Sequence, residues 1–147
     1  MSCVSTMSMS ILFNGEALDP IFPSRGIRQG DPISLYLFIL CMDYLRQLIE
    51  EKCSENLWQP VKASQSGLAF SHLFFADDLI FFAKADGVNS AAIGDVLDTF
   101  CSISSQTVSE AKPRVYFSPN MDRESLCDIL GFVSTPFLGM YLGFPLK

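Results

Sequence analysis

Residues 71–82 read SHLFFADDLIFF, in which two apolar, aromatic-rich runs flank the neighbouring acids Asp77 and Asp78. Short runs rich in phenylalanine and aliphatic residues are typical of β-strands, and polar residues between two such runs predict a turn. Consecutive side chains of a strand point to opposite faces, so both carboxylates serve one site only if the backbone turns there. The segment therefore predicts a β-hairpin that carries both acids at its turn.

The rest of the chain predicts further hairpins and helices around this segment. Asn14 and Gly15 form a strong hairpin signal between a loosely alternating run at 8–13 and a second run at 17–22. The other expected elements are helices at 34–53, with Ser34 as its cap, at 90–102 and at 123–130, strands near 107–108, at 114–118 and around 138–142, and a connection at 56–67. Because hairpins and helices are interleaved without regular βαβ repeats, the expected fold is α+β, with helices packed on an antiparallel sheet.

The length and composition suit one apolar, acidic domain or part of a larger one. The 147 residues are 49% hydrophobic, which argues against disorder, and the net charge of −6 points away from an independent nucleic-acid-binding protein. The longest apolar run, residues 35–42, is too short to span a bilayer, and no signal peptide is evident. Five scattered cysteines and one histidine argue against a disulfide framework and a zinc site. We therefore expect reduced thiols in an intracellular protein, cytoplasmic or nuclear, without membrane association.

The acid pair has two interpretations on its pattern alone. Two neighbouring carboxylates repel each other unless a cation neutralises them. Mg²⁺ binds through one or two carboxylates together with substrate phosphate oxygens, which is the two-metal arrangement for nucleotidyl transfer. A polar hairpin turn without any ligand explains the same residues, because acids are common at turns. His72, on an apolar strand, is interpreted as structural rather than as a ligand.

Four motifs, in order, resemble the reverse transcriptase of LINE-type (non-LTR) retrotransposons, especially those abundant in plants. Residues 75–78, FADD, resemble the Y/F-A-D-D signature, and residues 26–34, GIRQGDPIS, resemble the motif G-x-R-Q-G-D-P-x-S. Residues 36–38 match the start of the helix that follows it. Residues 100–118 resemble the segment that usually carries S-G-x-K-x-N/S-x-x-K-S, and residues 138–145, LGMYLGFP, are similar to L-G-x-Y-L-G-x-P. The resemblance covers nearly the whole chain.

The resemblance implies that residues 1–147 form a partial reverse-transcriptase palm, a fragment of an RNA-directed DNA polymerase. Its partners in the complete enzyme would be an RNA template, a DNA primer and dNTPs, and its cofactor two Mg²⁺ ions, with Mn²⁺ as an alternative. Asp77 matches the first signature aspartate, which is expected to ligate both metals. Asp78 matches the second, whose role is less direct.

Further roles follow from the other matching positions. Arg28, Gln29 and Gly30 match the loop that contacts the template and the incoming nucleotide, where glycine permits close backbone approach. Lys112 matches the lysine proposed to protonate the leaving pyrophosphate. Each has a simpler interpretation, because Arg28 can pair with Asp31 and an isolated lysine is usually a solvated charge.

Several family features are missing or changed. The family's third carboxylate lies on a strand upstream of the glycine–arginine loop, whereas Glu16 and Asp19 fall in the predicted hairpin; basic fingers are also lacking. Ser105 replaces a glycine whose position is expected to need positive φ, Thr107 replaces a lysine and Pro113 a serine. Because two-metal chemistry needs ligands from both strands, the chain is expected to be inactive alone. Alternatives are activity only with a missing upstream segment, or a non-catalytic interaction domain with an exposed apolar face.

Overall fold

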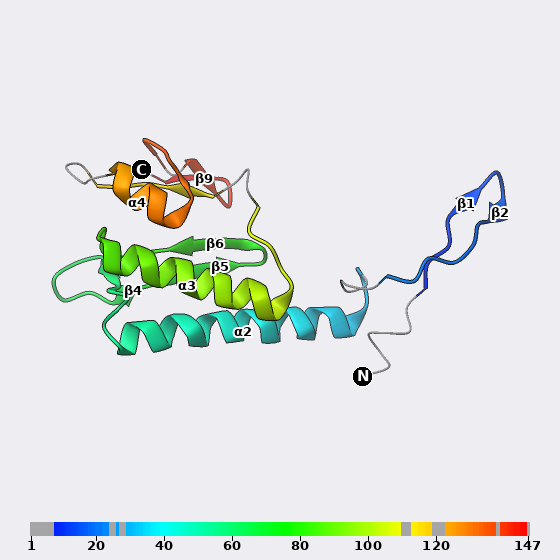
Figure 1. The fold of residues 1–147 in the computed structure, drawn as a ribbon, viewed down its shortest axis with the longest axis horizontal. Coiled ribbons are helices and arrows are strands. Elements are labelled where there is room, and N and C mark those ends of the chain that lie inside the picture. The colour runs from blue at the N-terminus through cyan, green and yellow to red at the C-terminus, as the bar shows by residue number, and fades with distance from the viewer. Residues whose placement is uncertain are drawn as a thin grey trace. The chain divides into compact units, whose positions relative to one another are not determined.

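Figure 1 shows the computed structural model of the chain. The residues that the structure describes are 8–23, 26, 29–109, 113–118, 123–137 and 139–146. The chain divides into two compact units, residues 1–42 and 43–147, and helix α2 (Pro32–Ser54) runs from the first into the second. Helices are mixed with small, mostly antiparallel sheets, which agrees with the predicted α+β class.

The first unit holds the predicted N-terminal hairpin. Its strands are β1 (Leu12–Phe13) and β2 (Glu16–Ala17), which pair antiparallel. Asn14 and Gly15 have φ values of +50° and +86°, the left-handed backbone that a tight two-residue hairpin turn requires. An isolated bridge between Met9 and Ile21 continues the pairing. The hairpin is therefore confirmed, with strands shorter than the runs that predicted it.

Helix α2 is capped by Asp31, and the expectation that Ser34 caps it is wrong. The backbone N–H of Ile33 donates to Asp31 Oδ1 at 3.1 Å, and that of Ser34 donates to the Asp31 carbonyl at 3.0 Å. Pro32 suits the first helical position because its missing N–H would have no intrahelical acceptor there. The aspartate supplies a capping oxygen one turn earlier than predicted, so the helix begins earlier too.

Helix α2 is also long and apolar enough to cross a membrane, judged by length and composition alone. Its most apolar stretch is 11% buried within the structure. The core helix of a soluble protein passes the same test, so one such helix is weak evidence for a membrane span. Within the helix, Arg46 forms ion pairs with both Asp43 and Glu50.

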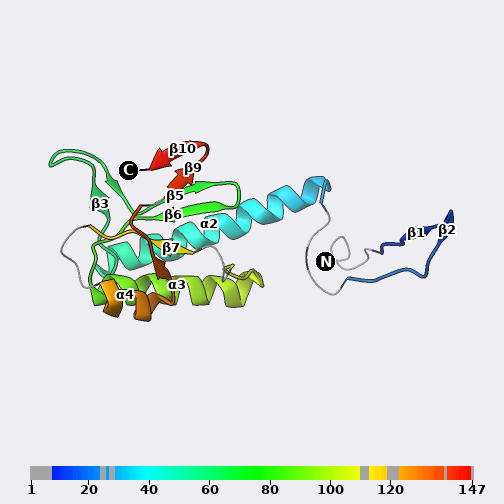
Figure 2. The same cartoon turned by 90° about the horizontal axis from the view of Figure 1, so that it is seen from above.

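The second unit combines the end of α2 with another helix and the central hairpin. These elements are α3 (Gly87–Ser104), β5 (His72–Phe75) and β6 (Asp78–Phe81). Figures 1 and 2 show α3 running beside the part of α2 that belongs to this unit, with the hairpin lying along both. An ion pair between Lys52 Nζ and Asp95 Oδ2, 2.6 Å apart, joins the helices and raises the pKa of Lys52, chiefly through its hydrogen bond to Asp95.

Apolar side chains from α2, from α3, from the connection after α2 and from the chain after α3 form the core of the second unit. The buried ones are Leu45, Ile49, Trp58, Ala92, Val96, Leu97, Phe100, Phe117 and Leu126. Asn89 is buried among them, yet its polar atoms are paired. Its backbone N–H and Nδ2 donate to Asp86 Oδ1 at 2.9 and 2.8 Å, and its Oδ1 accepts from the Gln59 N–H at 2.6 Å. Asn89 therefore ties the start of α3 to the connection that follows α2.

A short strand, β3 (Val61–Lys62), lies in the segment predicted as a plain connection. It pairs antiparallel with β4 (Ala69–Phe70), which follows that segment. Two-residue strands separated by polar residues show no alternation that sequence periodicity can detect. The prediction of a strand at 107–108 is wrong, because these residues leave the end of α3 as irregular chain.

The C-terminal part contains the predicted helix and two further pairs of strands. Its elements are β7 (Arg114–Val115), α4 (Arg123–Leu130), β8 (Val133–Ser134), β9 (Gly139–Tyr141) and β10 (Phe144–Leu146). The bounds of α4 match the prediction, and α4 packs on α3. The β9–β10 pair is antiparallel, whereas β7 and β8 pair in parallel. Among the described strands, the expected antiparallel sheet is thus divided into two-stranded pieces, one of them parallel.

Candidate active site

Asp77 and Asp78 lie at the turn of the β5–β6 hairpin, as predicted. The register pairs Phe75 with Asp78 and leaves Ala76 and Asp77 as a two-residue turn. Ala76 has a φ of +50°, which is uncommon for a residue with a Cβ. The turn interrupts the alternation of the strand between the two acids, so both carboxylates are carried at the same end of the hairpin.

The hairpin has an inner face of packed rings and an outer face open to solvent. On the inner face, the ring centroid of Phe74 lies 4.4 Å from that of His72 and 6.2 Å from that of Phe81, and the second contact is edge-on. On the outer face, Phe75 is 57% exposed. Asp78 pairs with Phe75 and shares this face, and Asp77 in the turn is exposed as well. The acids are thus accessible to a ligand in the described structure.

Trp58 fixes the opposite end of the hairpin to the core. Its indole Nε1 donates to the Phe82 carbonyl at 2.9 Å, and its ring meets Phe81 edge-on with centroids 5.5 Å apart. The side chain is 1% exposed. The Phe82 N–H donates to the Ser71 carbonyl at 2.8 Å, which closes the base of the hairpin. The hairpin that carries the acids is therefore attached to the core at the end opposite its turn.

The glycine–arginine loop is described only in part. Gln29 and Gly30 are exposed in a turn before α2, and Gly30 has a φ of +83°, which favours glycine. Arg28 and Lys112 lie outside the described residues, so their predicted roles stay predictions. Gln29 and Gly30 belong to the first unit and the acid hairpin to the second.

The chemistry of the acid pair can be compared with that of a metal site. Carboxylate oxygens are the hard ligands that Mg²⁺ prefers, and an exposed turn leaves them free to bind it. No group of three or more His, Cys, Asp or Glu side chains within the described ranges could hold a metal ion. The chemistry of Asp77 and Asp78 therefore fits a divalent cation, but further ligands are needed.

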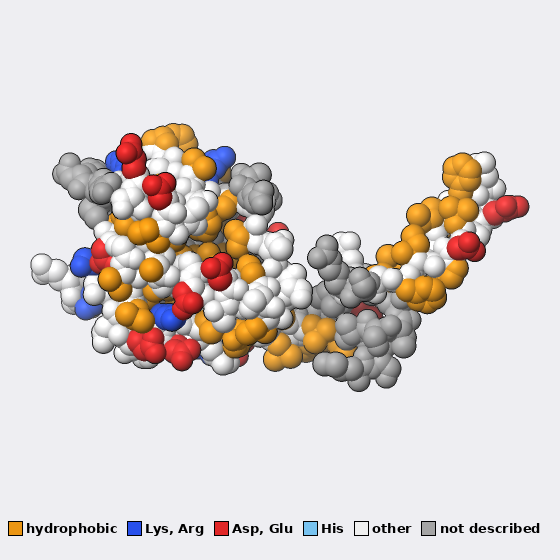
Figure 3. Space-filling model, viewed as in Figure 1, with side chains coloured by type: hydrophobic (Ala, Val, Ile, Leu, Met, Phe, Trp, Pro, Cys, Tyr) orange, Lys and Arg blue, Asp and Glu red, His pale blue; other side chains and the backbone are white. Residues whose placement is uncertain are grey.

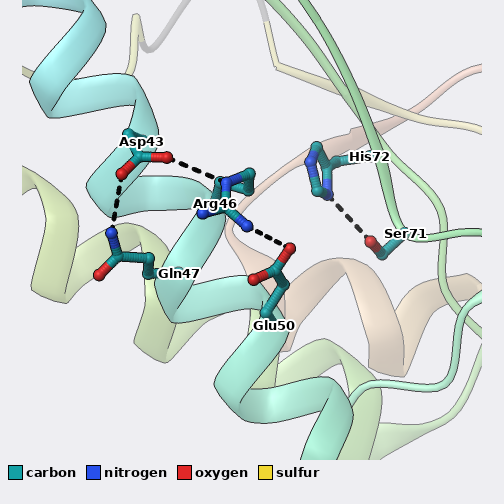
Figure 4. Close-up of polar contacts among 6 residues, drawn as sticks. All are labelled: Asp43, Arg46, Gln47, Glu50, Ser71 and His72. Carbon is teal, nitrogen blue, oxygen red and sulfur yellow. Dashed lines mark hydrogen bonds and ion pairs between the residues drawn. The ribbon is translucent and has the colours of Figure 1, made fainter.

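A second cluster of polar side chains lies on α2, on the side that faces β5 (Figure 4). Arg46 Nε donates to Asp43 Oδ1 at 3.0 Å, Arg46 also pairs with Glu50, and Gln47 Nε2 donates to Asp43 Oδ2 at 2.8 Å. Hydrogen bonds, first from Arg46, lower the pKa of Asp43, and the bond to Glu50 is the main cause that raises the pKa of Arg46. Spacings of three and four residues along a helix are the sequence signal for such pairs.

The family's glycine position after α3 has the backbone conformation expected of it. Ser105 ends the helix with φ +58° and ψ +16°, in the left-handed region. A residue with a Cβ loses roughly 1–2 kcal/mol there, which is why glycine commonly ends helices. Ser105 therefore holds a conformation that suits the family's glycine better.

Replacing Ser105 by glycine is expected to stabilise the second unit by about 0.5–1 kcal/mol. The relief of left-handed strain exceeds the roughly 0.5–1 kcal/mol that glycine loses through its greater freedom in the unfolded chain. Urea unfolding followed by the fluorescence of Trp58, the only tryptophan, measures the change. As a control, Ser102→Gly inside α3 should lower stability by about 0.5–1 kcal/mol. Equal losses in both variants would contradict the prediction.

Comparison with known proteins places the chain in a family. The chain belongs to the reverse transcriptase (RNA-dependent DNA polymerase) family, whose sequence model matches residues 1–143. The match includes the acid hairpin and the glycine–arginine loop. It confirms the resemblance drawn from the motifs.

Individual relatives come from plants and from retrotransposons. An uncharacterized mitochondrial protein of Arabidopsis thaliana is 40% identical over 67 residues, covering 46% of this chain and 55% of that protein. A retrovirus-related Pol polyprotein from a type-2 retrotransposable element of Drosophila melanogaster is 31% identical over 71 residues, which cover 48% of this chain and 6% of that protein. A retrovirus-related Pol polyprotein from a type-1 retrotransposable element of Popillia japonica is 28% identical over 86 residues, which cover 58% of this chain and 13% of that protein.

These relatives identify the chain as a partial reverse-transcriptase sequence of the non-LTR type. It spans about half the length of the plant relative and a much smaller share of the two polyproteins. No solved structure matches the chain.

Proposed function

We propose that the chain is part of the palm of a non-LTR retrotransposon reverse transcriptase and that Asp77 and Asp78 are its contribution to the catalytic centre. The observation that carries this proposal is the exposed acid pair at the turn of a hairpin whose base Trp58 anchors in the core. In a chain of this family, such a pair is better explained by metal binding than by a solvated turn alone.

The proposed reaction is addition of a nucleotide to a DNA primer along an RNA template. Bound Mg²⁺, or Mn²⁺, would activate the attacking hydroxyl and neutralise charge on the phosphates. Asp77 and Asp78 would hold the ions, and the turn between β5 and β6 carries both acids at one end of the hairpin. The outer face of the hairpin leaves both acids open to a nucleotide.

The remaining site residues are proposed from the family match. Arg28, Gln29 and Gly30 would contact the template and the incoming nucleotide, and the positive φ of Gly30 suits close backbone approach. Lys112 would donate a proton to the leaving pyrophosphate. An intracellular location, cytoplasmic or nuclear, remains a prediction.

We further propose that residues 1–147 do not polymerise DNA unaided. Among the described residues, the hairpin turn carries two carboxylates, and no group of three or more possible metal ligands is found. The matched polyproteins are far longer than the segment they share with this chain, and the third carboxylate would come from a segment outside the 147 residues. The net charge of −6 also offers little attraction for a template–primer duplex.

Primer extension on an RNA template with Mg²⁺ or Mn²⁺ tests both parts of the proposal. The chain alone should give no extension, and addition of an upstream palm fragment with an aspartate-bearing strand should restore it. Asp77→Asn with Asp78→Asn should return the restored activity to background, because asparagine keeps the size of each side chain but removes its charge. Asp98→Asn, an exposed acid on α3, is the matched control and should leave extension unchanged.

Two results would contradict the proposal. Restored extension that survives the Asp77 and Asp78 substitutions would remove the acids from the catalytic centre. Extension by the chain alone, lost in the double variant, would show that the 147 residues are sufficient.

Exposed apolar side chains favour a second candidate, a palm-derived interaction domain. Figure 3 shows hydrophobic side chains along the arm that carries β1 and β2. The most exposed large ones in the first unit are Leu12, Phe13, Phe22, Leu35, Tyr36 and Leu40, each at least 62% exposed. Exposed apolar surface of this kind commonly marks a binding face. A chain that remains a soluble monomer by size-exclusion chromatography with light scattering, and captures no protein partner, would count against this function.

A further inference from the structure

The turn that carries the acids differs from the two other two-residue hairpin turns among the described residues. The β1–β2 register leaves residues 14 and 15, Asn-Gly, as its turn, and the β9–β10 register leaves residues 142 and 143, Leu-Gly. The glycines of these turns have φ values of +86° and +82°. The acid turn consists of Ala76 and Asp77. It is therefore the one turn of these three in which both residues carry a Cβ.

Ala76, the first residue of the acid turn, has a left-handed backbone with a φ of +50°. A residue with a Cβ has only a small allowed region of φ and ψ there, and the conformation costs free energy. Glycine reaches it without this cost and has many other conformations open to it. Ala76 is exposed, so its methyl group does not fill the core. The alanine therefore restricts the turn at a cost that core packing does not offset.

The backbone of this turn decides where Asp77 lies relative to Asp78. Asp78 is the first residue of β6, and its pairing with Phe75 places it in the ladder. Asp77 lies outside the ladder, so its direction follows from the φ and ψ values of the turn itself. Ligands that are already held in the bound arrangement bind more tightly, because less freedom is lost on binding. A restricted turn therefore favours a site that uses both carboxylates.

We propose that Ala76 is a positioning residue of the acid pair. Its Cβ confines the turn to a narrow set of backbone conformations and so keeps the carboxylates of Asp77 and Asp78 in the arrangement that a divalent cation binds. Strained backbone of this kind persists where the surrounding structure holds it, and the base of this hairpin is attached to the core through Trp58. This role of Ala76 rests on the proposed function, in which the acids are ligands of the cation.

Mn²⁺ alone, added to the full chain, tests the proposal by NMR, because paramagnetic broadening of backbone amide signals detects even weak binding. Wild-type signals at the acid turn should broaden, and Asp77→Asn with Asp78→Asn should abolish the broadening. Ala76→Gly should bind Mn²⁺ about two- to five-fold more weakly, because the greater freedom of glycine is lost on binding. Its urea midpoint, followed by Trp58 fluorescence, should not fall, because glycine suits a positive φ.

Two further variants separate confinement of the turn from other effects of the substitution. Ala91→Gly, at an exposed position of α3, should lower the urea midpoint and leave the Mn²⁺ affinity unchanged. D-Alanine at position 76 keeps the methyl group and favours the left-handed conformation, so it should keep the wild-type affinity and raise the urea midpoint. Ligation at Cys53 and Cys101 assembles this chain from three synthetic segments.

The outcomes distinguish the role of Ala76 from that of the acids. Equal Mn²⁺ affinity of wild type and Ala76→Gly would overturn the role of Ala76 and leave the acid pair as a cation site. Equally weakened binding by the glycine and D-alanine variants would also overturn it, since confinement of the turn would not be the cause. Wild-type signals that do not broaden at the acid turn would contradict the proposed function, and the role of Ala76 would fall with it.

Discussion

Replacing Trp58 by alanine is expected to destabilise the second unit by about 3–5 kcal/mol, the usual cost of truncating a buried tryptophan. Its side chain is 1% exposed, so the substitution opens a cavity in the core. It also removes the N–H that donates to the Phe82 carbonyl. Domains are typically stable by only about 5–15 kcal/mol, so this single change removes a large share of the total.

Urea unfolding followed by far-ultraviolet circular dichroism measures the loss, because the variant has no tryptophan to report by fluorescence. Trp58→Phe is the matched variant, which keeps most of the ring and loses the N–H. It should cost less, about 1–3 kcal/mol. A loss within about 1 kcal/mol of zero for Trp58→Ala would show that the hairpin is not anchored by this residue.

Replacing Asn89 by alanine is expected to cost about 2–4 kcal/mol. The side chain is 1% exposed and makes two contacts: it accepts from the Gln59 N–H and donates to Asp86. Its loss leaves the Gln59 N–H without its acceptor, at roughly 1–3 kcal/mol, and opens a small cavity beside it. The expected result is a weaker link between the connection after α2 and the start of α3.

Fluorescence of Trp58, which precedes Gln59 in the chain, follows this unfolding in urea. Asp98→Ala, on the exposed face of α3, is the control and should change stability by less than about 0.5 kcal/mol. If Asn89→Ala unfolds at the same urea concentration as the Asp98→Ala control, the buried amide does not have the stabilising role given to it here.

The pH dependence of the same variant gives an independent check. Hydrogen bonds from Asn89 are the main cause that lowers the pKa of Asp86 in the folded chain. Asp86 therefore contributes stability above the ordinary aspartate pKa of about 3.9, and this contribution is lost as the pH falls through the folded-state pKa. In Asn89→Ala the lowering of the Asp86 pKa becomes smaller. The difference in the free energy of unfolding between variant and wild type should therefore be smaller in acid than at neutral pH.

The elements predicted well from sequence are those whose signals are local. The turn at Asn14 and Gly15, the acids between two apolar runs and the bounds of α4 each depend on residues near one another in the chain. The sequence does not predict the β3–β4 pair or strand β8. Strands β3 and β4 are too short to show a pattern, and β8 pairs with β7 across α4, a distance that local signals do not report. The cap at Asp31 was missed because Ser34 offered a similar local signal.

The features of the candidate site also divide into those that local sequence signals predict and those that they do not. The position of Asp77 and Asp78 at a turn could be predicted because a hairpin brings neighbouring residues together. The support from Trp58 could not, because its acceptor on Phe82 lies 24 residues further along the chain. The roles of Arg28 and Lys112 rest on motif matches, as these residues lie outside the part of the structure that is described.

The short-range pairing of the described strands has a consequence for the order of folding. Each antiparallel pair joins strands that are neighbours in sequence, and such hairpins form in about 1–10 μs. Chains dominated by contacts of low sequence separation fold in microseconds to milliseconds, whereas distant contacts slow the reaction. Burial of Trp58 against β6 joins residues farther apart in the chain and should be slower. The β5–β6 hairpin is therefore expected to form early, and the Trp58 indole is expected to pack against it afterwards.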